Sequence, residues 1–223
     1  MTPAVRRMLR SLSWVAVFAV AFALVEASVV IYLRALYYPG GFTFPLRDLP
    51  SGFFRLEVAR EAATILMLLA IGALAGAKPW EKFCYFIYAF GVWDLFFYFW
   101  LLVMIGWPAS VFEWDILFLI PVPWIGPVIA PVLVSLLMIA CGVIIAFRGA
   151  VGRSFRPGFL SWSLGLAATA LVLVSFMLDT EAGLHGAHPA PYHFELLSAG
   201  LAAYVAGFVL AWRTPPPAEA GPP

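Results

Sequence analysis

The sequence predicts an all-α integral membrane protein, a bundle of six transmembrane helices with a proline-broken or re-entrant segment before the fourth span. Two observations lead to this fold class. Of the 223 residues, 64% are hydrophobic and 11% are charged, and the mean hydropathy is +0.97, whereas about a quarter of the residues of a soluble domain are charged. In addition, apolar segments of about 20 residues, the length needed to cross a bilayer, recur along the chain.

Each span is expected to be a helix, because lipid offers the backbone no hydrogen-bond partner. The predicted spans are 14–36, 57–77, 82–105, 126–147, 159–178 and 193–212. The first is interpreted as a retained span rather than a signal peptide, since Glu26 interrupts it and no small-residue cleavage site follows. Residues 1–213 are therefore predicted to form one membrane domain, and the Pro- and Ala-rich residues 214–223 a disordered tail.

The basic residues predict that both termini lie in the cytoplasm and that the chain is a multi-pass protein of the cell (inner) membrane. In that orientation the cytoplasmic side holds nine Lys or Arg residues, whereas the outer connections hold Arg47 and Arg55. Cytoplasmic loops are the more basic ones in membrane proteins. A net charge of only +1 argues against a nucleic-acid partner. The expected partners are the lipid bilayer and either a second copy of the chain or other membrane subunits.

Small residues predict where helices approach each other closely. They recur from Gly72 to Gly76 in the second span and from Gly200 to Gly207 in the sixth. Such faces pack helices together in membranes. They belong either to the interior of the bundle or to contacts between protomers.

Ionisable residues inside the spans are the main indication of function, because each costs roughly 2.5–3.5 kcal/mol at the bilayer centre. Glu26 and Asp94 lie at the same depth, ~18 Å from the inner ends of their spans at ~1.5 Å per residue. Glu57, Arg60 and Glu61 share one face of the second span. The predicted binding cluster consists of Glu26, Arg60, Glu61 and Asp94, with Glu57 and Arg34 at its mouth and Asp115 near its rim.

The deep residues of this cluster carry more negative than positive charge. Protonation, a bound cation or a water-filled opening would relieve the excess. In the alternative interpretation, Arg60 pairs with a carboxylate and the network only fixes the register of the helices.

The third span is unusually aromatic, with Phe, Tyr or Trp at eleven of the eighteen positions from Phe83 to Trp100. Tyr98 lies one turn from Asp94 and shares its face. This pattern suits a slot for a flat or long hydrophobic ligand, such as a quinone, a carotenoid or an isoprenoid. Ordinary aromatic packing against helices and lipid is the alternative, and the sequence identifies no cofactor.

The segment from Glu113 to Gly126 is not expected to be a simple helix, because Pro121 and Pro123 remove backbone donors and favour extended geometry before them. It is predicted to be a short re-entrant or interfacial element folded over the outer cavity. The alternative is an amphipathic surface helix followed by a turn. Pro127 suits the start of the following helix.

The histidines are weak metal candidates. His185, His188 and His193 fall within nine residues and Glu195 follows them, a spacing that can bind zinc or copper. The setting is rich in Gly and Pro and no cysteine supports a site. His193 and Glu195 could instead join the outer cavity.

These observations predict a membrane protein with an acidic polar cavity open to the outer side, which binds or transports protons, a cation or a small solute. A non-catalytic subunit of a larger membrane complex is the first alternative. An intramembrane enzyme that uses the buried carboxylates is the second. Whether the chain is an enzyme stays open at this point.

Overall fold

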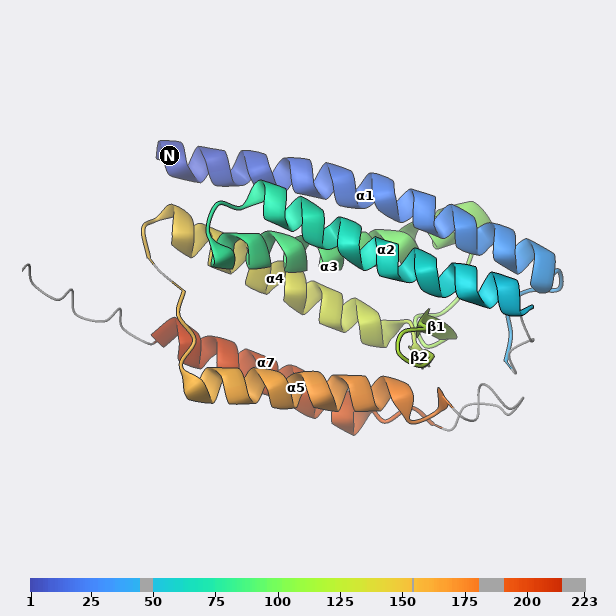
Figure 1. Cartoon of the computed structure of the whole chain (residues 1–223). Helices are drawn as coiled ribbons and strands as arrows, with labels where there is room; N and C mark the ends of the chain where they lie inside the picture. Colours follow the sequence, from blue (N-terminus) through green and yellow to red (C-terminus); the bar gives the residue numbers. More distant parts are fainter. Residues whose placement is uncertain (45–49, 154, 181–190, 214–223) are drawn as a thin grey trace, which may run out of the picture.

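The computed structural model describes residues 1–44, 50–153, 155–180 and 191–213. Six long helices of this part of the chain run along a common axis (Figure 1): α1 (Pro3–Tyr37), α2 (Ser51–Ala75), α3 (Pro79–Ile105), α4 (Ile129–Ala150), α5 (Phe159–Met177) and α7 (Phe194–Arg213). Each is long and apolar enough to cross a membrane. The six predicted spans are confirmed as helices, and the predicted tail lies outside the described residues.

Local sequence explains where the first and third helices begin. The hydroxyl group of Thr2 accepts the backbone N–H of Val5 at 3.3 Å, and Pro3 occupies the first helical position, where its missing donor is harmless. The Glu81 carboxylate accepts the backbone N–H of Lys78 at 3.2 Å at the start of α3. These caps satisfy donors that a helix start leaves unpaired.

The proline-rich segment forms a short β-hairpin beside the six long helices, so the alternative interpretation of a surface helix was wrong. Strands β1 (Trp114–Phe118) and β2 (Trp124–Pro127) pair antiparallel, with Asp115 opposite Gly126. The two prolines that exclude a helix lie in the turn between the strands. The helix that follows begins at Ile129, two residues after Pro127. The hairpin lies at the end of the bundle remote from the N-terminus (Figure 1).

Helix α3 is the central element of one block, in which it packs against α1, α2 and α4. Glycines allow close approach on two sides. A Cβ atom added at Gly72 would lie 2.8 Å from Phe86, and one added at Gly142 would lie 2.8 Å from the carbonyl oxygen of Cys84. Ala19 and Ala89 are fully buried in the same core. Small side chains thus set the spacing of this block.

Helices α5 and α7 form a second unit and pack mainly on each other. A Cβ atom added at Gly200 would lie 2.8 Å from Val172, and one added at Gly207 would lie 3.1 Å from the carbonyl oxygen of Ser161. These small-residue faces are therefore occupied within the chain rather than free to join protomers.

The α5–α7 pair meets the first block at its two ends. At the hairpin end, the Trp124 ring stacks on Phe176 with ring centroids 6.1 Å apart. At the other end, the Trp80 ring of α3 lies with its centroid 5.9 Å from that of Trp162 of α5, and the Arg148 guanidinium donates to the carbonyl oxygen of Trp212 at 2.9 Å. The last contact places a cation at the C-terminus of α7, where the helix dipole favours it.

The close approach of α3 and α4 can be tested with two glycines on the same helix. We expect Gly142→Ala to lower the free energy of unfolding by about 1–3 kcal/mol, because its methyl group would overlap the α3 backbone. Gly149→Ala is the matched control, since a Cβ atom there meets nothing within 4 Å. Unfolding in mild detergent should show a loss for Gly142→Ala alone. Equal effects of the two variants would contradict the packing described.

Candidate functional site

Buried charged residues gather in the half of the α1–α4 block that carries the hairpin. They come from α1, α2, α3 and β1, and each carboxylate is at most 8% exposed. The members are Glu26, Arg34, Glu57, Arg60, Glu61, Asp94 and Asp115. The carboxylates are thus covered by protein rather than spread over an open surface.

Arg60 of α2 joins two helices through its guanidinium group. It donates to Glu57 one turn earlier at 2.8 Å and 3.0 Å, and it also pairs with Glu26 of α1. The i,i+3 spacing of Glu57 and Arg60 explains the first contact. The second depends on α1 and α2 lying side by side. One guanidinium group therefore serves two carboxylates.

Glu61 faces the hairpin instead of a second cation. Its carboxylate accepts the backbone N–H of Leu119 at 2.7 Å, just after β1. A hydrogen bond from an amide to a carboxylate is charge-assisted and stronger than a neutral one. This bond ties the hairpin to α2.

Asp94 lies near the middle of α3, where it faces α4. The hydroxyl group of Ser135 donates to its carboxylate at 2.8 Å. Both residues are buried, with exposures of 8% for Asp94 and 2% for Ser135. Gly91, one turn before Asp94, brings the helices together, since a Cβ atom there would lie 2.6 Å from the Ser135 carbonyl oxygen. Among the described residues, Asp94 therefore has a neutral donor and no guanidinium partner of its own.

Asp115 of β1 pairs with Arg34 near the end of α1, at 2.8 Å. The Arg34 guanidinium lies between two aromatic rings, 3.8 Å from the centroid of Trp107 and 4.4 Å from that of Phe42. The Asp115 carboxylate also interacts with the hydroxyl group of Tyr98 on α3. This second group of residues connects α1, α3 and the hairpin.

Burial dominates the electrostatics of Asp115. It raises the pKa of Asp115 to about 6, because removal from water disfavours the carboxylate, while the Arg34 guanidinium acts in the opposite direction. The Arg34–Asp115 ion pair therefore titrates in a range that cells can reach.

The predicted single cluster is divided in the structure. Arg60 lies with Glu26, Glu57 and Glu61, so Glu57 is inside the cluster rather than at its mouth. Asp94 lies with Ser135 and near Asp115, away from Arg60. Sequence reasoning missed Ser135, although a serine in an apolar span was a possible signal. It also missed the Leu119 amide, which no sequence pattern marks.

Of the metal candidates, His193 and Glu195 lie in the described part of the chain, and they contact each other at 2.6 Å as exposed side chains. They do not join the buried carboxylates. Among the described residues no group of three metal-ligand side chains is arranged to hold an ion. His185 and His188 lie outside the described residues.

The Arg34–Asp115 ion pair can be tested by removing its cation. We expect Arg34→Met to cost about 3–5 kcal/mol at pH 8, because it leaves a buried carboxylate unpaired. The loss should shrink toward pH 5, where Asp115 takes up a proton. In the wild type the folded pKa of about 6 exceeds the ordinary value of 3.8, so this group stabilises the fold below pH 4 and loses that contribution as the pH rises through 6.

The double variant Arg34→Met with Asp115→Leu is the control, since it removes both charges. It should recover most of the loss in thermal unfolding in detergent at pH 8. A double variant as unstable as the single one would show that the two residues do not interact.

Comparisons of the chain with protein-family models, with curated proteins and with solved structures found no match.

Proposed function

We propose that this multi-pass membrane protein binds protons at the buried carboxylates of its hairpin half. The observation that supports this proposal is the balance between buried negative and positive charges. In the α1–α4 block and the hairpin, five buried carboxylates, Glu26, Glu57, Glu61, Asp94 and Asp115, accompany two guanidinium groups, Arg34 and Arg60, which leaves an excess of three negative charges if all are ionised. At roughly 3 kcal/mol for each charge within a membrane, the excess would cost about 9 kcal/mol. That is comparable with the whole stability of a domain.

Protons suit this arrangement better than a metal ion does. Each of three carboxylates contacts a different partner: Glu26 contacts Arg60, Glu61 accepts from the Leu119 amide, and Asp94 accepts from the Ser135 hydroxyl group. A cation site needs oxygen ligands that converge on one point. A proton needs only one carboxyl group and an acceptor or donor beside it.

The geometry favours binding over conduction across the membrane. Asp94 and Ser135 belong to the buried part of the site. Beyond them, toward the N-terminal end of α1, the core contains apolar residues such as Leu12 and Val15. In the described part of the chain, Glu81 at the start of α3 is the one carboxylate in that half. The site can therefore exchange protons with one side of the membrane.

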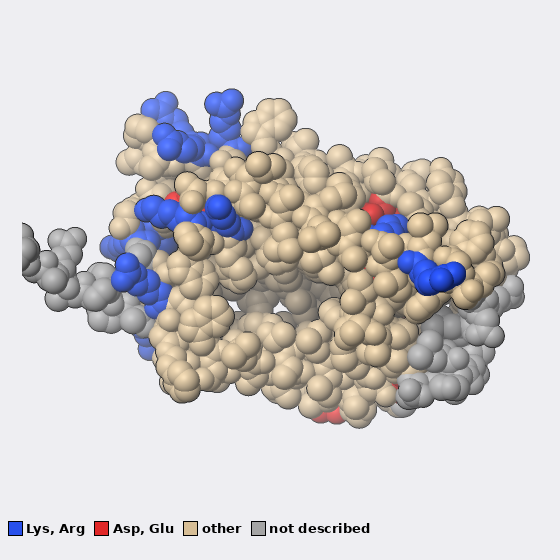
Figure 2. All heavy atoms as spheres, in the orientation of Figure 1, with Lys and Arg blue, Asp and Glu red and all other residues tan. Residues whose placement is uncertain are grey.

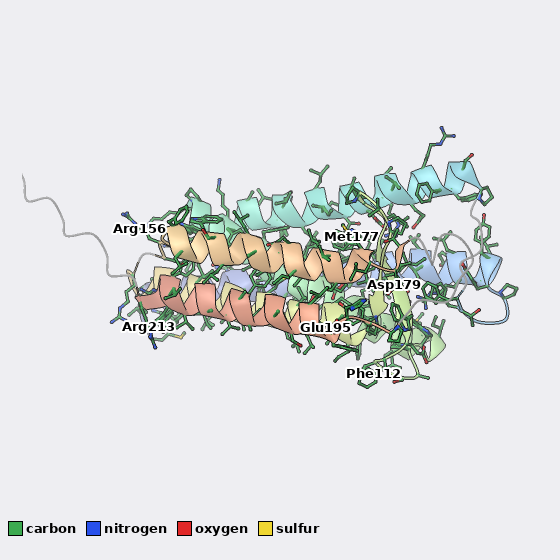
Figure 3. All side chains as sticks on the ribbon, turned by 90° about the horizontal axis from the view of Figure 1, so that it is seen from below. Phe112, Arg156, Met177, Asp179, Glu195 and Arg213 are labelled. Atoms are coloured by element: carbon green, nitrogen blue, oxygen red, sulfur yellow. The ribbon has the colours of Figure 1, made fainter. Side chains whose placement is uncertain are left out.

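That side is proposed to be the outer one. Lys and Arg residues crowd the end of the molecule that holds the N-terminus (Figure 2). Arg156 and Arg213 lie at that end of the α5–α7 pair, whereas Asp179 and Glu195 lie at the other (Figure 3). Basic ends face the cytoplasm in cell membranes. The hairpin and its carboxylates would then respond to the pH outside the cell.

Proton binding at Glu61 would change the structure through the Glu61–Leu119 hydrogen bond. A protonated carboxyl group is a weaker acceptor than a carboxylate, so protonation of Glu61 would loosen the hairpin from α2. A small solute would be a second ligand of the same site. The subunit interpretation loses the support of the small-residue faces, since Gly72, Gly200 and Gly207 pack within the chain.

A pH series of stability measurements tests the proposal. If the folded state holds protons at neutral pH that the unfolded state releases, stability must fall as the pH rises, by about 1.4 kcal/mol per pH unit for each proton. We expect wild-type protein in detergent to lose stability from pH 6 to pH 9. Asp94→Asn and Glu61→Gln should each make this decline shallower.

Glu195→Gln is the matched control, because the Glu195 side chain is 70% exposed and should leave the decline unchanged. A wild-type stability that is flat or rises over this range would refute proton binding. Restoration of stability at pH 9 by Na⁺ or K⁺ would assign the site to a cation instead.

A further inference from the structure

A cavity separates the α5–α7 pair from the α3–α4 face of the first block. Its volume is about 430 Å³, within the roughly 300–1,000 Å³ range of ligand pockets. Figure 2 shows the molecule hollowed in this region, open toward the side of the bundle. Contacts that join the two units lie at either end, Trp124 with Phe176 and Trp80 with Trp162. The cavity lies between these attachments and does not include the carboxylate site.

The walls of the cavity are almost entirely apolar. Helix α4 contributes residues from Val134 to Ile145, and Phe83, Leu166 and Phe208 line it from other helices. At ~1.5 Å per residue, the α4 wall is ~16 Å long. This is about half of the ~30 Å hydrocarbon layer, which is the depth of one leaflet.

Two of the three hydroxyl groups on the walls, those of Thr169 and Tyr204, offer little to a polar ligand. Thr169 donates to the carbonyl oxygen of Gly165 at 2.8 Å and lies 2.7 Å from the hydroxyl group of Tyr204. With the Thr169 proton used on Gly165, Tyr204 is the donor of the second bond. Both protons are then used within the protein. A ligand group at this depth therefore gains no donor from them, which favours a plain hydrocarbon chain over a quinone ring.

Basic residues lie at the end of the cavity nearer the N-terminus. Arg156 is exposed and lies in sequence between Phe155 and Pro157, both of which line the cavity. Lys82, in the first turn of α3, is also exposed at this end of the bundle. Basic residues at a membrane surface attract anionic lipid headgroups. The apolar walls and the basic rim together match one amphipathic molecule.

We infer that the cavity binds an anionic phospholipid of the leaflet at the basic end, with one acyl chain between α4 and the α5–α7 pair and the phosphate near Arg156 and Lys82. Because a bilayer already surrounds the chain with hydrocarbon, the apolar walls decide only whether an acyl chain fits the cavity. The preference for an anionic headgroup comes from the basic residues at its end. The lipid would fill the space that the two units leave between their end contacts.

Gly165 allows a direct test, because it lines the cavity and a Cβ atom there meets nothing within 4 Å. Gly165→Leu should fill the cavity without disturbing the fold. Gly149→Leu is the matched control, a helical glycine with equally open surroundings that does not line the cavity. Native mass spectrometry of the full chain from mild detergent should find one phosphatidylglycerol retained by wild type and by Gly149→Leu, and at least a tenfold lower occupancy in Gly165→Leu.

The headgroup preference is tested separately with Lys82→Gln and Arg156→Gln, which do not fill the cavity. Each charge near an anionic surface contributes roughly fivefold to affinity. Titration with phosphatidylglycerol and phosphatidylcholine should therefore show about a 25-fold loss of phosphatidylglycerol affinity in the double variant and little change for phosphatidylcholine. Arg10→Gln on α1 is the control and should retain wild-type affinity. Equal affinity of the wild type for both lipids, a quinone retained in preference, or unchanged lipid binding in Gly165→Leu would overturn the inference.

Discussion

A buried carboxylate that lacks a hydrogen-bond donor costs several kcal/mol of folding free energy when protein and lipid exclude water from it. At the hairpin end, the donors to the buried carboxylates come from elements that are far apart in the sequence. Arg60 supplies one from α2, Ser135 one from α4, and Leu119 one from the hairpin. Each contact fixes the rotation or position of the element that provides it. The arrangement of this half of the bundle thus depends on where negative charge is buried.

The same constraint explains which features could be predicted from sequence. Apolar segments of the right length identify helices, since the chain has no other way to satisfy its backbone in lipid. The shared face of Glu57, Arg60 and Glu61 follows from helical periodicity alone. The partner of Asp94 could not be predicted in this way, because depth along a helix does not determine its rotation. The close contact of Gly91 with the Ser135 backbone turns the face of α3 that carries Asp94 toward α4, and Asp94 therefore does not meet Arg60.

The hairpin and its contacts also could not be predicted from the sequence. Proline spacing excludes a continuous helix, yet the pairing of Asp115 with Gly126 depends on two strands meeting in register. The Arg34–Asp115 ion pair joins residues 81 positions apart, and no local pattern reports such a contact. Likewise, the apolar cavity arises because the α5–α7 pair meets the first block at its ends. Its lining residues resemble any other apolar helix surface in the sequence.

Proton binding at this site requires that some buried carboxyl groups are protonated at neutral pH. Infrared spectroscopy of the wild-type protein in lipid vesicles at pH 7 measures this directly, because a protonated carboxyl group has a C=O stretch that a carboxylate lacks. We predict a protonated-carboxyl band that persists at pH 7 and weakens in Asp94→Asn. A spectrum with carboxylate bands alone at pH 7 would refute proton binding by the buried carboxyl groups.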